Sequence, residues 1–202
     1  MDKRKRKILV MAIALFMIFP ATYVIAADSG GGAFKLEGAW VAKVISVNGI
    51  EGNYPFQWSY ILSPDPSGKS ATVHGSADVG VPDFVVFPID YKSPFFGEIV
   101  MTGPDTTSFD SYFYGVKKLP VEEDNPYYDS NIYSNYYQLV YILRVWGTSV
   151  RIGPDESEAT DNFEFYLPEA DGDGDGFPDP DSTPVITFTA TTLDTRVPFP
   201  FE

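Results

Sequence analysis

The residues best suited to chemistry form the acidic run 171–179, in which glycines separate the carboxylates. Aspartates occupy alternate positions at the start of the run, and the glycines let the chain bend tightly enough to turn several oxygens inward. Calcium suits such a loop, because it takes about six to eight oxygen ligands at roughly 2.3–2.6 Å. The spacing predicts a structural calcium loop within residues 168–184. Its ligands are expected from Asp171, Asp173, Asp175, the carbonyl of Phe177, and Asp179.

The run shares its sixth position with an EF-hand but departs from an EF-hand at the twelfth position and in its flanks. Gly176 at the sixth position permits the sharp turn, but Ser182 stands at the twelfth, where an EF-hand has a bidentate Glu. Pro168 and Pro184 flank the run in place of helices. The run resembles a single copy of the calcium repeats of the thrombospondin type 3 class, without the cysteine of that class and with Asp181 offset by one position. The alternative is a solvated acidic linker.

Residues 1–26 are expected to be a signal peptide rather than part of the fold. Five basic residues, Lys3 to Lys7, precede the apolar stretch 8–19, and small residues near Ala26 offer a cleavage site. The apolar stretch is too short to span a bilayer comfortably and no second one follows, so we expect no stable membrane insertion after cleavage. The expected location is the bacterial periplasm or the exterior, reached by Sec export, and residues 27–35 are expected to form a flexible leader.

The rest of the chain carries a strongly negative charge. Residues 1–26 contain five of the 14 Lys and Arg and one of the 28 Asp and Glu, which leaves nine basic and 27 acidic residues and a net charge of −18. Such a surface repels nucleic acids and anionic lipid headgroups, so we expect no nucleic-acid partner. The absence of cysteine and the single histidine exclude cysteine nucleophiles and histidine-clustered zinc sites.

Residues 36–202 are predicted to form one all-β domain. Aromatic and β-branched residues recur in short runs, and turn residues such as those of 63–68 separate the runs. The regular spacing predicts an antiparallel barrel of about 8–10 strands, with a β-sandwich as the alternative. Strands are expected at 37–47, 55–62, 69–77, 84–90, 95–102, 107–118, 136–146, 148–152, 160–167 and 184–197.

Side-chain alternation predicts which strand faces are buried. Phe163 and Phe165 alternate with polar residues, and the stretch 186–191 alternates apolar residues with threonines. Both patterns are typical of strands with one buried face. The stretch 139–145 is apolar on both faces and therefore predicts a central strand covered on two sides, or one whose second face meets a ligand or another subunit.

The tripeptide Gly38-Ala39-Trp40 opens the first expected strand and resembles the start of lipocalins. The resemblance implies a closed eight-stranded barrel in which Trp40 plugs one end and Arg196, on a late strand, covers it. It also implies a cavity for a small lipophilic ligand, with Trp40 and Trp58 as candidate contacts. The T-D-Y motif and C-terminal helix of that family are not recognisable here. The alternative is a tryptophan simply buried in a β core.

The segment 125–137 is rich in tyrosine. Tyrosine combines a flat apolar face with a hydroxyl at its tip, and this combination is favoured at sugar and protein contacts. The alternatives are a long loop folded over one end of the barrel, or self-association. The candidate binding residues are Tyr127, Tyr128, Tyr133, Tyr136 and Tyr137.

These features predict a secreted, non-enzymatic binding protein of undetermined oligomeric state. The first hypothesis is a lipocalin-like carrier of a small lipophilic molecule with a structural calcium loop. The second is a calcium-stabilised β-sandwich that recognises carbohydrate or a protein surface through its tyrosines. No catalytic residues are expected, because His74 and Ser76 are near neighbours along one strand and the sequence has no nucleophile elbow.

Overall fold

The computed structural model describes residues 36–54, 56–77, 87, 89–118 and 137–198. The chain divides into two units, Met1–Gly32 and Ala33–Glu202, and every described residue belongs to the second. Among these residues, no helix is long and apolar enough to cross a membrane.

The described part of the chain is almost entirely β-strand. One turn of 3-10 helix, η1 (Pro168–Ala170), accompanies the strands. The strands are β1 (Gly38–Val47), β2 (Ile50–Glu51), β3 (Gln57–Pro64), β4 (Ser70–Ala77), β5 (Tyr91–Lys92), β6 (Phe95–Met101), β7 (Thr106–Lys118), β8 (Tyr137–Gly153), β9 (Glu156–Tyr166) and β10 (Ile186–Val197).

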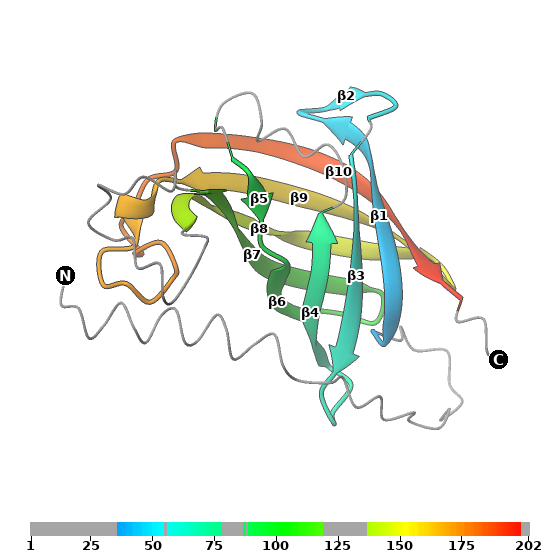
Figure 1. Ribbon diagram of the computed structural model, residues 1–202. Helices are drawn as coiled ribbons and strands as arrows, with labels where there is room; N and C mark the ends of the chain where they lie inside the picture. The colour runs from blue at the N-terminus through cyan, green and yellow to red at the C-terminus, as the bar shows by residue number, and fades with distance from the viewer. Residues whose placement is uncertain (1–35, 55, 78–86, 88, 119–136, 199–202) are drawn as a thin grey trace, which may run out of the picture. The chain divides into compact units, whose positions relative to one another are not determined.

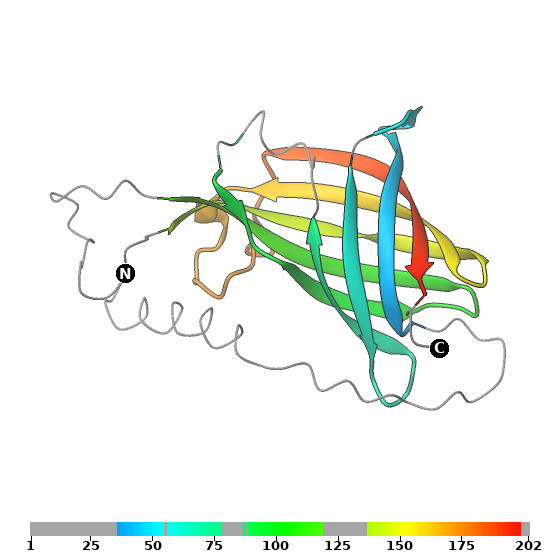
Figure 2. The same cartoon turned by 45° about the vertical axis from the view of Figure 1, so that its right-hand side comes forward.

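Eight of these strands form a closed antiparallel barrel, and β2 and β5 are short additions to it. The sheet runs in the order β10-β9-β8-β7-β6-β4-β3-β1, and β1 then pairs with β10 from Ala39↔Val197 to Val47↔Ala190. Figures 1 and 2 show β1 lying between β3 and β10, so that the sheet has no free long edge. The predicted barrel is therefore confirmed, and the alternative of a β-sandwich is wrong, because a sandwich has two separate sheets.

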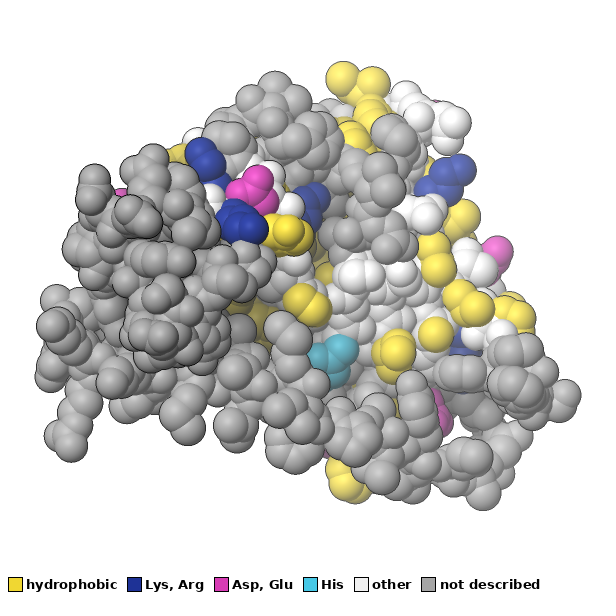
Figure 3. Space-filling view, in the orientation of Figure 1, with side chains coloured by type: hydrophobic (Ala, Val, Ile, Leu, Met, Phe, Trp, Pro, Cys, Tyr) yellow, Lys and Arg dark blue, Asp and Glu magenta, His cyan; other side chains and the backbone are white. Residues whose placement is uncertain are grey.

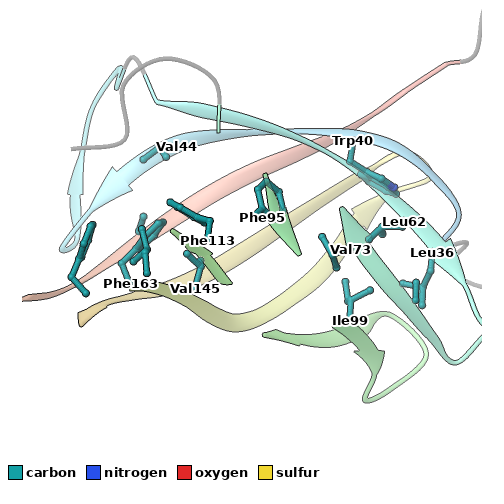
Figure 4. Close-up of a cluster of buried hydrophobic side chains, with 14 of the residues drawn as sticks. Leu36, Trp40, Val44, Leu62, Val73, Phe95, Ile99, Phe113, Val145 and Phe163 are labelled. Carbon is teal, nitrogen blue, oxygen red and sulfur yellow. The ribbon is translucent and has the colours of Figure 1, made fainter. Parts of the chain in front are cut away.

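The core lies inside the barrel and follows the two-residue period of the strands. In β1, for example, Trp40, Ala42 and Val44 are buried, whereas the residues between them are partly or fully exposed. Figure 4 shows buried side chains from several strands pointing into the same interior, with Trp40, Leu62 and Ile99 toward one end. A continuous ring of backbone pairing thus surrounds a mainly aromatic and aliphatic core.

The two ends of the barrel differ in the length of their connections. Three short hairpin turns, between β3 and β4, β6 and β7, and β8 and β9, lie at one end, together with the start of β1 and the end of β10. The connections from β1 to β3, from β4 to β6, from β7 to β8 and from β9 to β10 all leave from the opposite end and are longer. We call these the hairpin end and the loop end.

The structure corrects several expected strands. The two strands expected at 136–146 and 148–152 are one strand, β8, described from Tyr137 to Gly153, and the next strand begins earlier than residue 160. The strand expected at 84–90 falls mostly outside the described residues, and its described members, Phe87, Ile89 and Asp90, are not in a strand. The stretch 139–145 is covered on two sides, as expected of a central strand, because Tyr141, Ile142 and Leu143 are all fully buried.

Gly147 explains the wrongly expected break in β8. It lies within the strand opposite Phe109 of β7 and Asp161 of β9, facing the interior. A Cβ atom at this position would lie 1.9 Å from the carbonyl oxygen of Thr160, so the glycine allows close approach of two strands rather than a turn. Gly97 in β6 is similar, since a Cβ there would lie 2.1 Å from the carbonyl oxygen of Asp110.

We expect Gly97→Ala to destabilise the barrel by about 1–3 kcal/mol, because the added methyl group displaces the β7 backbone. Gly153→Ala is the matched control, since its Cβ would lie an ordinary 3.4 Å from the nearest atom. Urea unfolding of both variants measures the difference. Equal stability of the two variants would contradict the close packing of β6 against β7.

Candidate functional site

The barrel contains an internal cavity of about 60 Å³. Its wall is mainly aromatic and aliphatic, and it includes both tryptophans that the sequence identified as candidate contacts. The main apolar lining residues are Trp40, Trp58, Tyr60, Leu62, Phe95 and Val145. Trp40 is fully buried in the core, and Trp58 is partly buried against it.

Two carboxyl groups also line the cavity, and sequence reasoning did not identify them. Asp161 in β9 and Asp194 in β10 are 3% and 6% exposed, respectively. Both project inward because they occupy the same phase as the core residues of their strands, such as Phe163 and Ala190. The site is therefore an apolar cavity with an acidic patch, rather than the purely apolar cavity expected.

The hydrogen bonds of the acidic pair are incomplete. The Tyr60 hydroxyl donates to Oδ2 of Asp194 at 3.1 Å, and the Thr192 hydroxyl donates to Oδ2 of Asp161 at 3.0 Å. Oδ1 of Asp194 is buried and has no hydrogen-bond partner among the described residues. The described residues that line the cavity include no Lys, Arg or His. A buried acceptor without a donor is costly, so this atom is the chemical focus of the cavity.

Burial also shifts the protonation of these groups. Desolvation raises the pKa of Asp194 to about 6, although the hydroxyls of Tyr60 and Thr192 favour the ionised form. Desolvation, together with the nearby charge of Asp194, raises the pKa of Asp161 well above its usual value. The same two causes, burial first, raise the pKa of the Tyr60 hydroxyl. Tyr60 therefore remains a donor at neutral pH.

Trp40 lies toward the hairpin end of the cavity. Its ring stacks on that of Tyr60, with centroids 6.5 Å apart and planes 9° from parallel. Arg196 of β10 lies opposite Trp40 in the strand register, and its guanidinium occupies the space above Gly38. Asp155 lies 3.7 Å from this guanidinium. Trp40 and Arg196 thus lie opposite each other in the strand register at this end, and the covering of Trp40 by Arg196 that the lipocalin resemblance implied stays a prediction.

Aromatic rings also gather at the loop end. Phe87 lies 5.4 Å from Tyr141 and 6.0 Å from Phe165, measured between ring centroids. Phe188 in turn stacks on Phe163 at 4.5 Å. These rings separate the described part of the cavity wall from the loop end, so a ligand that enters from that side must pass an aromatic layer.

The acidic loop brings together three of its five expected calcium ligands. Carboxylate oxygens of Asp171, Asp173 and Asp175 lie within 4.8 Å of one another. The backbone N–H groups of Gly174 and Gly176 donate to the carboxylate of Asp171 at 2.8 and 3.1 Å. Both glycines have positive φ, 76° and 97°, which other residues adopt at a cost. The loop therefore turns as its glycines allow and gathers three negative charges.

The Asp179 carboxylate and the Phe177 ring make other contacts, and the Phe177 carbonyl stays a predicted ligand. The Asp179 carboxylate accepts a hydrogen bond from the N–H of Gly172 at 3.0 Å and does not belong to the group of three. The ring of Phe177 packs against the outer wall of the barrel, 4.9 Å from the ring of Tyr112 and 6.2 Å from that of Phe96. Phe177 has a packing role that the sequence did not predict.

A tyrosine of β7 fixes the loop to the barrel wall. The Tyr114 hydroxyl donates to the carbonyl oxygen of Gly176 at 2.9 Å. Burial, reinforced by the charges of Asp171 and Asp175, raises the pKa of Tyr114 to about 12, so the hydroxyl keeps its proton at neutral pH. Figures 1 and 2 both show this orange loop beside β7 and β8. The loop is a docked element rather than a free linker.

The remaining candidate residues do not join either site. Tyr127, Tyr128, Tyr133 and Tyr136 lie outside the described residues, and Tyr137 is described only as the first residue of β8. His74 is exposed on the outer face of β4, where Figure 3 shows it in cyan. It does not line the cavity.

Comparisons with known proteins give no family assignment. No protein family and no curated protein matches this sequence. Among solved structures, the chain is similar to EF1p2_mFAP2b bound to DFHBI, with a TM-score of 0.41 and 15% sequence identity. The match covers 80% of this chain and 94% of that one. A similarity at this level carries no information on function, so the function must be argued from the residues of this chain.

The buried acids predict a pH-dependent stability. The pKa of Asp194 is about 6 in the folded protein and roughly 3.9 when unfolded, so between these values the folded state binds the extra proton. The free energy of unfolding therefore falls as pH rises through this window, by about 1 kcal/mol per pH unit, and is lower above pH 6. Asp161, with its raised pKa, acts in the same direction.

We expect a higher Tm at pH 5 than at pH 7.5 in calorimetry with EDTA present, and Asp194→Asn should remove much of the difference. Glu158→Gln, an exposed residue of β9, is the control that loses the same unit of charge without entering the cavity. A wild-type Tm that is equal at both pH values, or higher at pH 7.5, would contradict the burial of these acids.

Proposed function

We propose that this protein is a secreted, non-enzymatic carrier that binds one small molecule inside its barrel. The observation that supports the proposal is the internal cavity, which combines aromatic walls with an unpaired buried acceptor, Oδ1 of Asp194. Ligand sites are typically concave and mostly apolar, with few polar groups that fix orientation. The barrel interior has this composition.

The size of the cavity limits the ligand. The cavity of about 60 Å³ holds roughly four or five water molecules. Equally, it holds a compact organic molecule of about ten non-hydrogen atoms or fewer. Apolar burial contributes about 25 cal/mol per Å² to such binding. Long-chain lipids do not fit without rearrangement of the aromatic layer at the loop end, so the ligand class is a small compact lipophile.

The proposed location outside the cytoplasm rests on the sequence of residues 1–26, with its basic start and short apolar stretch. An extracellular or periplasmic setting supplies free calcium at higher levels than cytoplasm, which agrees with an exposed, modest calcium loop.

Iodobenzene, a small neutral quencher of tryptophan, tests the carrier function. We expect saturable quenching of Trp40 and Trp58 in a Trp146→Phe background, because the first two tryptophans line the cavity and Trp146 lies on the outer face of β8. Val145→Phe should fill the cavity and abolish saturable quenching. Val145→Phe should lower the free energy of unfolding by less than about 1 kcal/mol. The same change in a core that is already filled would lower it by roughly 1–3 kcal/mol, because the extra atoms would overpack the core.

Val150→Phe is the matched control, because Val150 belongs to the same strand but is 48% exposed. It should leave quenching unchanged. Linear, non-saturating quenching in all variants, with a large loss of stability in Val145→Phe alone, would show that side chains fill the interior and would end the proposal.

We further propose that the acidic loop binds one structural calcium ion. The carboxylates of Asp171, Asp173 and Asp175 fit this role, because three like charges within 4.8 Å repel one another unless a cation lies between them. All their oxygens are acceptors, which suits a hard divalent cation. Bound calcium would favour the folded loop and, through Tyr114 and Phe177, its attachment to the barrel wall.

Calcium should raise the Tm of the protein, because the ligands come together only when the connection between β9 and β10 is folded. Without a bidentate Glu at position 12, affinity should be about 10⁻⁴–10⁻³ M. At ~100 times the dissociation constant, the gain in stability would be roughly 2.7 kcal/mol. Calorimetry with millimolar calcium and with EDTA measures this shift.

Asp173→Ala and Asp175→Ala should each abolish the shift and leave the apo protein folded, since both side chains are exposed. Asp181→Ala is the control that removes one exposed charge from the same connection but none from the group of three. The same Tm with calcium and with EDTA would show that the loop is an acidic turn without a metal.

A further inference from the structure

The buried acids of the cavity restrict the chemistry of the ligand. Asp161 and Asp194 come from adjacent strands and line the same cavity, and each is more than nine-tenths buried. Carboxyl groups are rarely buried to this extent unless they are paired. Among the described residues, the hydrogen-bond partners of the two acids are hydroxyl donors, from Tyr60 and Thr192, and the described lining contains no cation.

The unused hydrogen-bonding capacity is directional. One oxygen of Asp194 accepts a hydrogen bond from Tyr60, which fixes the carboxyl plane. The other oxygen, Oδ1, is buried without a hydrogen-bond partner among the described residues, and Asp194 itself lines the cavity. An ionised carboxyl here lacks a counter-charge, because the nearby inward arginine of the same strand, Arg196, lies beside Asp155 at the hairpin end. The described part of the protein thus supplies an acceptor, and an occupant of the cavity can supply the donor.

The surrounding rings favour a cationic donor over a neutral one. Trp58 and Tyr60 line the cavity together with Asp194, and the faces of aromatic rings attract ammonium groups. A charge-assisted hydrogen bond between an ammonium group and a carboxylate is about twice as strong as a neutral one. An anionic ligand would meet two acids and no basic group in the described lining.

We propose that the barrel is selective for small amines: its ligand is a compact, largely apolar molecule that carries one protonated amino group, and this group binds Oδ1 of Asp194. The inference rests on the proposed carrier function and specifies its ligand class. Asp161 lies beside this group in the cavity lining, and the aromatic wall encloses the apolar remainder of the molecule.

Three probes of nearly equal shape test this selectivity: benzylamine, benzyl alcohol and benzoate, measured by calorimetric titration at pH 7.5. We expect benzylamine to bind at least tenfold more tightly than benzyl alcohol, and benzoate to show no binding. Asp194→Asn should weaken benzylamine binding by tenfold or more while leaving benzyl alcohol within about twofold.

Glu158→Gln controls for the general attraction of an amine to an acidic protein, because it removes one exterior charge from β9. It should leave all three affinities unchanged. Equal binding of benzylamine and benzyl alcohol by the wild type, or an equal loss in both control and Asp194→Asn, would overturn the amine selectivity. The carrier function would survive that result as long as iodobenzene still quenches saturably, and it would fail with the inference if none of the four probes binds.

Discussion

The pairing of β1 with β10 is the constraint on which the rest of the structure depends. It joins residues that are 143 (Val47 and Ala190) to 158 (Ala39 and Val197) positions apart and converts a curled sheet into a barrel with one interior. Closure fixes the alternation of every strand at once, because a slip of one residue would exchange the inward and outward faces. Trp40 lies inside only because β1 has this register against both β3 and β10.

The same closure places acids where they are costly. Inward-facing residues alternate along β9 and β10. Nearer the loop end they are apolar, as at Phe163 and Ala190, and nearer the hairpin end they include Asp161 and Asp194. A barrel selected only for stability would have apolar residues at these positions, since buried charges offset part of the gain from apolar burial. The proposed ligand would compensate for two acids buried beside an internal space. On the outside, the loop of residues 168–184 uses Phe177 and Tyr114 to attach its charges to the wall without burying them.

The sequence predicted the fold class well, because strand alternation and turn residues are local signals. Trp40 and Trp58, the candidate ligand contacts, both line the interior cavity, and their role in binding stays a prediction. The division of β8 at Gly147 was wrong, since a glycine that permits close strand contact looks like a turn residue in sequence. The sequence could have revealed the buried acids, because every second residue of a strand faces the same side. Counting back two residues from Phe163 gives Asp161, and counting forward six residues from Phe188 gives Asp194. The missing hydrogen-bond partner of Asp194 could not be predicted from the sequence, because it depends on which strands the barrel closure brings together.

A crystal structure of the protein grown with benzylamine would show directly whether the barrel interior holds a ligand whose amino group completes the hydrogen bonding of Asp194. The account predicts density for one molecule in the cavity, with its nitrogen within hydrogen-bond distance of Oδ1 and its ring against Trp58 and Tyr60. A cavity filled by ordered water alone, or closed by movement of the surrounding aromatic side chains, would contradict it.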